Sequence, residues 1–552
     1  MKKIFKVIAT TLAASCVLSC SYLDMTPTDR VSDKTIWENT TNAEYGVNYI
    51  YTYIYNIYSN QCTAGLTEAL TDQMKYGSYQ YNSYCYIPSE ISYRDESTLS
   101  PSFVDVYLGK WGTMYSYLRK TNQSIDALRK YGKMSQQDKT RLEGELRFMR
   151  AYIYTDLAKR YGDVIFYDEN MKNIQRNQKL TPESVIWEFI ENDLKFAADN
   201  LPEKASAKGR LDKGAAYAFM SRAMLYAKNW ESAKNAATQV ETLGYTLMSN
   251  YADSYQKTSN QGNTEIILQY LFDRKHKTSH NFDFYYSPGG DYYGRGESGG
   301  GYGTPTQEMV ESYELKEGGF PDWTPWHSTE GTLEEPPYNK LEPRFQASIL
   351  YNGSDWKGRK IEPFVKGMDG WSEWNTEREP MGRTTTGYYL RKGVDETHDV
   401  ITESGSVQPA CIIRFAEVLL NKAEACYNLG EESLANDLVK KIRNRVGLPY
   451  TAKAGDELWE AIRQERKVEL AYEGLWYWDL RRWGVAHEIY PKGLEGYQQH
   501  GLKIEKVGGD FRYTYVSVDD QNRHFSKKMY RFPIPEAELN NNKDIDQFEN
   551  WK

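Results

Sequence analysis

Three glutamates spaced four residues apart are the first group in the sequence that could do chemistry. Glu465, Glu469 and Glu473 would lie on one face of a helix, and glycoside hydrolysis needs two carboxyl groups side by side. The same stretch supplies Arg463 and Arg466 as charge partners, and 76 acidic residues make such a spacing common by chance. We therefore expect structural ion pairs here, and we predict that the protein is not an enzyme.

Two weaker patterns suggest a cofactor or a metal site. Gly294, Gly296 and Gly299 match GxGxxG, but no apolar strand precedes them and no helix follows, so a flexible loop explains them better than a dinucleotide site. His276 and His280 have the spacing of helical zinc ligands, yet they lie in a polar, turn-like stretch without HExxH. We predict no cofactor and no metal.

Aromatic rings on loops offer a different chemistry, which is ligand binding by stacking. The chain has 46 tyrosines and 14 tryptophans, so many rings must lie at surfaces or interfaces. An exposed ring can stack on the C–H face of a pyranose while polar neighbours such as Asp291 bond the sugar hydroxyls. Three clusters supply the candidate ligand-binding residues: Tyr79, Tyr81, Tyr84, Tyr86, Tyr285, Tyr286, Tyr292, Tyr293, Trp323 and Trp326.

The competing interpretation is that these rings pack in the core. The alternation in YGSYQYNSYCY (76–86) also fits a half-buried strand, whereas the second cluster lies in a glycine-rich loop. Trp323 and Trp326 are flanked by Pro321 and Pro325, which stiffen the backbone and would preorganise a platform for a sugar. These two tryptophans are therefore the favoured candidates.

The N-terminus has the pattern of a lipoprotein signal peptide. Three lysines precede an apolar run over residues 7–18, which is too short to span a bilayer. The sequence VLSC ending at Cys20 has the form of a lipobox, and Cys16 is a weaker alternative because Val17 and Leu18 would then remain on the mature chain. We predict a signal peptide over 1–19 and lipidation of Cys20.

Helical periodicity predicts a mostly α scaffold. Residues 142–160 carry apolar side chains at helical spacing and end at a Tyr-Gly-Asp turn, and the motif helix with the three glutamates should end at Gly474. Residues 214–244 and 412–447 each predict two helices joined by a short break, which is a tetratricopeptide-like unit. Between them, residues 246–405 are rich in glycine, proline and aromatic residues, so they predict long loop insertions with few short strands such as 265–271.

Charge and cysteine content exclude some classes of protein. The net charge of -8 and the absence of a basic patch make nucleic acid an unsuitable partner. Apart from the signal region, the cysteines are Cys62, Cys85, Cys411 and Cys426, with no CxxC pair. A bridge between Cys62 and Cys85 and a set of buried free thiols are equally compatible with this spacing.

Four stretches carry a resemblance to a known family. They are CSYLDMTPTD after the signal peptide, LEGELRFMRAYIYTDLAKRYGDV at 142–164, ERKVELAYEGLWYWDLRRWG at 465–484 and YRFPIPEAEL near the C-terminus. Together they closely resemble the motifs of the SusD/RagB family. The chain departs from the family pattern at Leu475-Trp476 and at Phe548-Glu549.

The resemblance implies a fold, a location and a partner. It implies an N-terminal helical region over 20–245, ligand-binding insertions over 246–405 and a C-terminal RagB/SusD region over 406–552. It also implies a lipid-anchored outer-membrane protein that faces the exterior and passes a glycan to a SusC-like TonB-dependent transporter. Peptide capture, as in RagB-like proteins, is the main alternative; a non-binding assembly scaffold and a surface glycosidase are weaker ones.

Overall fold

The computed structural model describes residues 33–58, 67–76, 91–92, 94, 97–170, 177–205, 207–255, 262–294, 299–372, 383–403, 405–489, 497–519 and 521–552. Within these ranges the protein is mainly helical, and its strands are short and pair two by two. The mostly α fold class predicted from the sequence is therefore confirmed. The signal peptide, Cys20, Cys62 and Cys85 lie outside the described residues, whereas Cys411 and Cys426 are free and buried.

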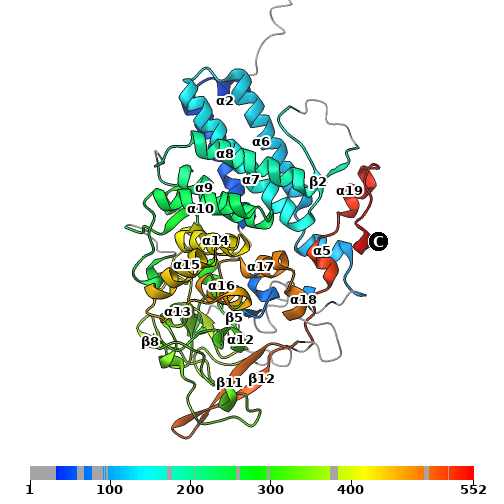
Figure 1. Cartoon of the computed structure of the whole chain (residues 1–552). Coiled ribbons are helices and arrows are strands. Elements are labelled where there is room, and N and C mark those ends of the chain that lie inside the picture. The colour runs from blue at the N-terminus through cyan, green and yellow to red at the C-terminus, as the bar shows by residue number, and fades with distance from the viewer. Residues whose placement is uncertain are drawn as a thin grey trace, which may run out of the picture.

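Most of the N-terminal helices lie at one end of the molecule (Figure 1). The N-terminal helices are α2 (Asp33–Trp37), α3 (Thr40–Tyr58), α5 (Pro101–Tyr107), α6 (Trp111–Tyr131), α7 (Gln136–Tyr161), α8 (Glu183–Asn200), α9 (Lys213–Tyr226) and α10 (Trp230–Thr242). Helix α7 packs against α3, α6 and α8, so most of its side chains are buried. The Ser135 side chain caps its first turn, and Gly162 ends it with a φ of 69° that favours glycine. The predicted helix over 142–160 and the pair over 214–244 are both present.

A second group of helices packs below α9 and α10. It consists of α14 (Phe415–Asn428), α15 (Glu432–Arg445), α16 (Gly455–Glu469), α17 (Trp476–Trp483) and α18 (Ala486–Ile489). The predicted helix pair over 412–447 begins later than expected, because residues 412–414 belong to strand β10 (Ala410–Arg414). This strand pairs with β4 (Ile266–Tyr270), and its β-branched Ile412 and Ile413 suit the buried pleat.

The opposite end of the molecule is rich in loops (Figure 1). Its helices are short: α11 (Phe282–Tyr286), α12 (Gln307–Val310) and α13 (Pro343–Ser348), with 3-10 turns at Tyr251–Asp253, Arg274–His276, Gly289–Tyr292, Thr324–Trp326 and Tyr338–Lys340. Its strands are β5 (Gly303–Pro305), β6 (Ile349–Leu350), β7 (Asp355–Trp356), β8 (Arg359–Lys360) and β9 (Tyr389–Leu390). The predicted strand over 265–271 is present as β4.

The remaining elements are a short helix, 3-10 turns and strands outside the groups described above. They are the 3-10 turns Thr67–Leu70, Lys527–Tyr530 and Glu549–Trp551, helix α19 (Glu536–Asn541), and strands β1 (Met74–Tyr76), β2 (Val164–Ile165), β3 (Leu180–Thr181), β11 (His500–Val507) and β12 (Asp510–Ser517). The antiparallel pairs are β1–β5, β2–β3, β4–β10, β6–β9, β7–β8 and β11–β12. One large apolar core lies among the helices, and a second, rich in tyrosine and tryptophan, fills the loop-rich end.

A buried ion network joins these two parts. Glu469 on α16 accepts hydrogen bonds from Arg414 at 2.7 Å, from Arg344 at 3.2 Å and from Arg445. Burial alone would raise the pKa of Glu469, but the guanidinium groups of Arg445, Arg414 and Arg344 outweigh it and hold that pKa well below its usual range. The Glu469 carboxylate is therefore ionised and forms structural ion pairs, as the sequence predicted. Its partners are not the nearby arginines of the same helix but Arg414, Arg344 and Arg445, which come from other segments.

The motif helix ends earlier than predicted. Helix α16 stops at Glu469, and the following turn places Tyr472 at a φ of 62°, in the left-handed region. The Tyr472 hydroxyl donates to the carbonyl of Gln73 at 3.2 Å, which ties this turn to β1. Glu473 thus leaves the helix face, yet it still accepts a hydrogen bond from Arg414 at 2.6 Å.

Replacing Glu469 with Gln should destabilise the protein strongly. Three buried guanidinium groups would lose their shared anion, and breaking a buried ion pair typically costs about 3–5 kcal/mol of unfolding free energy. Chemical denaturation followed by circular dichroism measures this. Glu460→Gln is the matched control, because the Glu460 side chain on the same helix is mostly exposed; its cost should stay below about 1 kcal/mol.

The stability difference between the wild type and the Glu469→Gln variant should depend on pH. The folded-state pKa of Glu469 lies below the ordinary value of 4.5, so its ionised form stabilises the fold above that pH. The stability gap between wild type and Glu469→Gln should therefore narrow as the pH falls below 4.5. A gap that widened in acid would contradict the role of Glu469 as an ionised partner.

Candidate ligand-binding surface

The glycine-rich loop that carries the second cluster of rings is closed at its base. Gly300 N–H donates to the carbonyl of Phe284, and Tyr302 N–H donates to the carbonyl of Tyr285, both at 2.9 Å. A Cβ atom at Gly300 would lie 2.1 Å from the carbonyl oxygen of Ser287, so this close approach requires glycine. The loop continues into β5, which pairs with β1.

The four predicted rings of this loop differ in exposure. Tyr286 is fully buried and Tyr292 is 2% exposed, so both belong to the core. Tyr285 is half-buried and packs on Tyr302 with ring centroids 4.7 Å apart. Tyr293 is 68% exposed. Tyr293, and one edge of Tyr285, are therefore the parts of this cluster that can meet a ligand.

An ion cluster fixes the same loop to the segment that follows it. The Asp291 carboxylate accepts hydrogen bonds from Trp356 Nε1 at 3.0 Å and from Arg359 at 2.9 Å. Arg359 also donates to Asp369 at 2.7 Å, and Asp369 accepts from the backbone N–H of Gly290 at 2.9 Å. Asp291 is thus occupied by structural partners, contrary to its expected role in bonding sugar hydroxyls.

Trp323 and Trp326 do not form the exposed platform that their flanking prolines suggested. Each is 6% exposed, and the two rings pack edge to face with centroids 5.6 Å apart. Trp326 Nε1 donates to the carbonyl of Glu334 at 2.9 Å. Both rings belong to the aromatic core of the loop-rich end. Phe320, on the same loop, is 54% exposed instead.

The first predicted cluster of rings comes directly after β1 in the chain. Tyr79, Tyr81, Tyr84 and Tyr86 lie outside the described residues, so their contact with a ligand stays a prediction. They follow β1, whose last residue, Tyr76, pairs with Gly303 and is fully buried.

The β11–β12 hairpin supplies a cluster that the sequence interpretation missed. The Tyr515 ring lies between two imidazoles, with centroid distances of 4.4 Å to His500 and 4.7 Å to His327. His500 Nδ1 lies 2.7 Å from Glu308, and His327 Nε2 lies 2.6 Å from Glu311. Burial raises the pKa of Glu308, although His500 partly offsets this. The cluster combines ring faces with fixed polar groups, as a site for a polar ligand requires.

A signal for this hairpin exists in the sequence. Phe511, Tyr513 and Tyr515 alternate with polar residues directly after the Gly508-Gly509 pair, which is the pattern of a hairpin strand.

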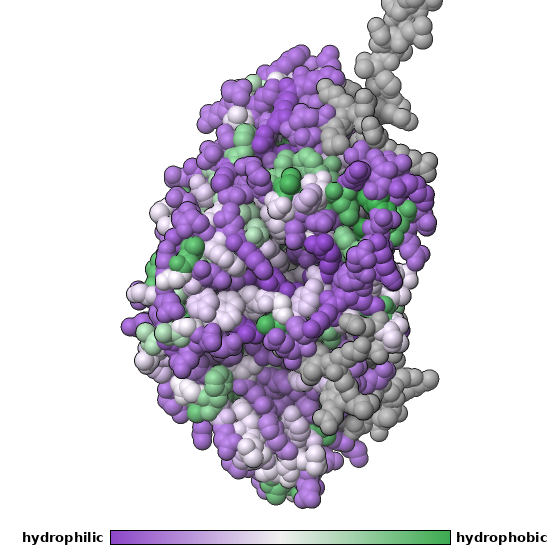
Figure 2. All heavy atoms as spheres, turned by 45° about the vertical axis from the view of Figure 1, so that its right-hand side comes forward, coloured by the Kyte–Doolittle hydropathy of each residue, from purple (hydrophilic) through white to green (hydrophobic). Residues whose placement is uncertain are grey.

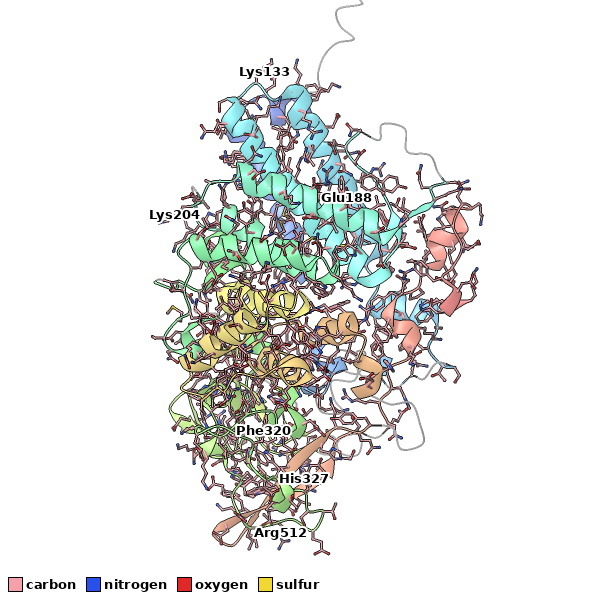
Figure 3. The ribbon with its side chains drawn as sticks, viewed as in Figure 1. Lys133, Glu188, Lys204, Phe320, His327 and Arg512 are labelled. Carbon is pink, nitrogen blue, oxygen red and sulfur yellow. The ribbon has the colours of Figure 1, made fainter. Side chains whose placement is uncertain are left out.

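Figure 3 shows Phe320, His327 and Arg512 together at the loop-rich end, far from Lys133 on the helices. In Figure 2 this side of the molecule is mainly hydrophilic, and pale residues of intermediate hydropathy gather over the lower, loop-rich half.

A separate groove of about 800 Å³ opens beside α13. Asn250, Gln346, Arg391 and Gln408 give it polar walls, and Tyr255 contributes a ring that is 6% exposed. Of the predicted rings that the structure describes, none lines this groove. The described candidate surface therefore consists of the exposed rings Tyr293, Phe320 and His327 and the half-buried rings Tyr285 and Tyr515, which we call the loop-end rings.

Truncating Trp326 should reveal a core residue. Trp326→Ala should lower the unfolding free energy by about 3–5 kcal/mol, because it opens a large cavity in a packed aromatic core. Phe320→Ala is the control from the same loop, and its exposed ring should cost less than about 0.5 kcal/mol. Equal stability of Trp326→Ala and wild type in chemical denaturation would show that the indole does not pack in the core.

Comparisons with known proteins agree with this architecture. A family model described as "SusD family" matches residues 264–551, and a second, described as "Starch-binding associating with outer membrane", matches residues 21–225. A SusD-like protein from Bacteroides ovatus is 26% identical, with 96% of this chain and 89% of the relative covered. None of the helices in the described ranges has both the length and the apolar character needed to cross a bilayer.

Two solved structures share the fold. A SusD-like protein from Bacteroides fragilis has a TM-score of 0.78 at 26% identity, covering 95% of this chain and all of that chain. A SusD-like carbohydrate-binding protein from the same species has a TM-score of 0.74 at 23% identity, covering 93% of this chain and 100% of that one. Since the family model alone spans more than half of the sequence, the chain belongs to the SusD family.

Proposed function

We propose that this protein is a lipid-anchored glycan receptor on the outer face of the outer membrane. It captures an oligosaccharide or polysaccharide and delivers it to a SusC-like TonB-dependent transporter. The observation that carries this proposal is membership of the SusD family, with matched segments that begin directly after Cys20 and run to residue 551. A structural neighbour described as a SusD-like carbohydrate-binding protein supports the ligand class.

The loop-end rings fit this ligand chemistry. A pyranose presents an apolar C–H face and a rim of hydroxyl groups, so a site for it needs exposed rings and oriented hydrogen-bonding groups. Tyr293 offers a free ring, and Tyr515 offers a ring edge beside the imidazoles of His327 and His500. The glycine-rich loop that carries Tyr293 is held by the Asp291–Arg359 ion pair, so little ordering entropy of this loop is lost when a ligand binds.

We propose that the protein binds its ligand without catalysing a reaction. Glu469 is buried and ionised among arginines, so it has neither the access nor the raised pKa of a general acid. Peptide capture remains the second candidate, because tyrosine rings also bind peptide side chains and backbone. The test therefore includes both ligand classes.

The first test measures retardation in native gels that contain starch, laminarin, xylan, mannan or galactan, followed by calorimetry with a mixed peptide library. We expect one polysaccharide to retard the mature protein and the peptides to give no heat. Tyr293→Ala should weaken binding about tenfold or more, as truncation of an aromatic anchor does, whereas Val106→Ala, which is 73% exposed on α5, should change nothing. Heat with peptides and no retardation by any glycan would favour the peptide candidate instead.

The second test concerns the anchor. Cys20→Ala should release a soluble protein, because the diacyl group on Cys20 holds the wild type to the membrane. Protease added to intact cells should degrade the wild type if it faces the exterior. Immunoblots of whole cells and membrane fractions measure both effects, and a wild type that resists protease in intact cells but not in lysed cells would contradict the outward orientation.

A further inference from the structure

Two grooves meet at Gln123 on helix α6, at the helical end of the molecule (Figure 1). The first, of about 700 Å³, lies between α2, α3 and α6. The second, of about 740 Å³, lies between α6, β2 and α19. Because both grooves include Gln123, they adjoin across α6. Neither contains any of the loop-end rings.

The first groove carries two exposed tyrosines on a rigid support. Tyr45 is 68% exposed and Tyr49 is 58% exposed, and they lie one turn apart on the same face of α3. Tyr49 packs edge to face on Tyr53 at 5.8 Å, and Tyr53 stacks on Tyr117 of α6 at 3.9 Å. The buried Trp37 lines the same groove. The Tyr49 ring is therefore held in place before any ligand arrives, and Tyr45 lies one turn away on the same helix.

The second groove adds rings and charged groups. Tyr115 and Tyr167 pack edge to face at 5.8 Å, and Asn122 Nδ2 donates to the carbonyl of Tyr167 at 3.0 Å. Arg119 and Asp126 line the same groove. Such walls would oppose an apolar protein helix, because its nonpolar face would bury charged groups without partners. They suit a ligand that carries many hydroxyl groups.

We propose that these adjoining grooves form a second glycan site, which holds an extended stretch of polysaccharide across α6. Tyr45 and Tyr49 would stack on successive sugar rings, and Gln123 and Arg119 would bond hydroxyls where the strand passes from one groove to the other. Each groove has the volume of a typical small-ligand site, so together they accommodate a longer oligomer than either alone. This inference rests on the proposed function, and it adds a site remote from the loop end.

The test uses the mature protein in native gels containing the polysaccharide that retards wild type most strongly in the panel above. Tyr45→Ala/Tyr49→Ala should weaken retardation about tenfold, because two aromatic anchors are lost. Tyr45→Phe/Tyr49→Phe keeps the rings and should bind as wild type does. Thermal unfolding of both variants should match the wild type, because the two side chains are largely exposed.

A trisaccharide of the same sugar distinguishes the two sites in calorimetry. It can occupy either site but cannot span both, so the wild type should bind it at two sites, Tyr293→Ala should keep only the binding in the grooves, and Tyr45→Ala/Tyr49→Ala should keep only the binding at the loop end. Undiminished polysaccharide retardation in that double variant, with a loss in Tyr293→Ala, would overturn the second site and leave the proposed function standing. If the double variant bound glycan normally but no longer copurified with a transporter, the grooves would be a protein contact and the inference would be wrong. Failure of every polysaccharide to retard the wild type would overturn both proposals.

Discussion

The buried charge network around Glu469 is the interaction on which the rest of the structure depends. Its arginines come from β10, α13 and α15, so one carboxylate joins the helical scaffold to the loop-rich end. Glu265, at the start of β4, and Glu473, in the turn after α16, share Arg414 with it. Buried charges are tolerated only when they are fully paired, so each segment must arrive in one position for the others to be stable. The relative placement of the two parts is fixed in this way.

Many of the aromatic residues build the second apolar core, at the loop-rich end. The Tyr338 and Tyr388 hydroxyls bond each other at 2.9 Å, and Tyr388 donates to Gln307 at 2.6 Å. Such rings supply apolar area in a region with little regular secondary structure, while their hydroxyls satisfy the backbone and polar groups that irregular loops leave unpaired. A loop-rich end can therefore be rigid. Rigid loops in turn allow a few remaining rings, such as Tyr293, to stay exposed in fixed positions.

Exposed rings occur at both ends of the molecule, on different kinds of support. At the loop end they project from turns and from the β11–β12 hairpin. At the helical end Tyr45 and Tyr49 project from a helix, so their spacing is set by the helical repeat. A receptor for a long polymer gains from two such surfaces, because a strand held at one is at high effective concentration for the other.

The sequence alone determined the family, the helical class and the helices over 142–160 and 214–244, because local periodicity and capping residues specify such elements. It also identified the glutamates as structural. It did not determine their partners, the turn at Tyr472 or the strand at Ile412, since these depend on contacts with residues far away in the chain. Exposure of the rings was decided by tertiary structure as well. Trp326 and Tyr293 both lie in glycine- and proline-rich loops, yet the fold buries one and exposes the other. Composition shows that a ring is available, and only packing decides which face meets solvent.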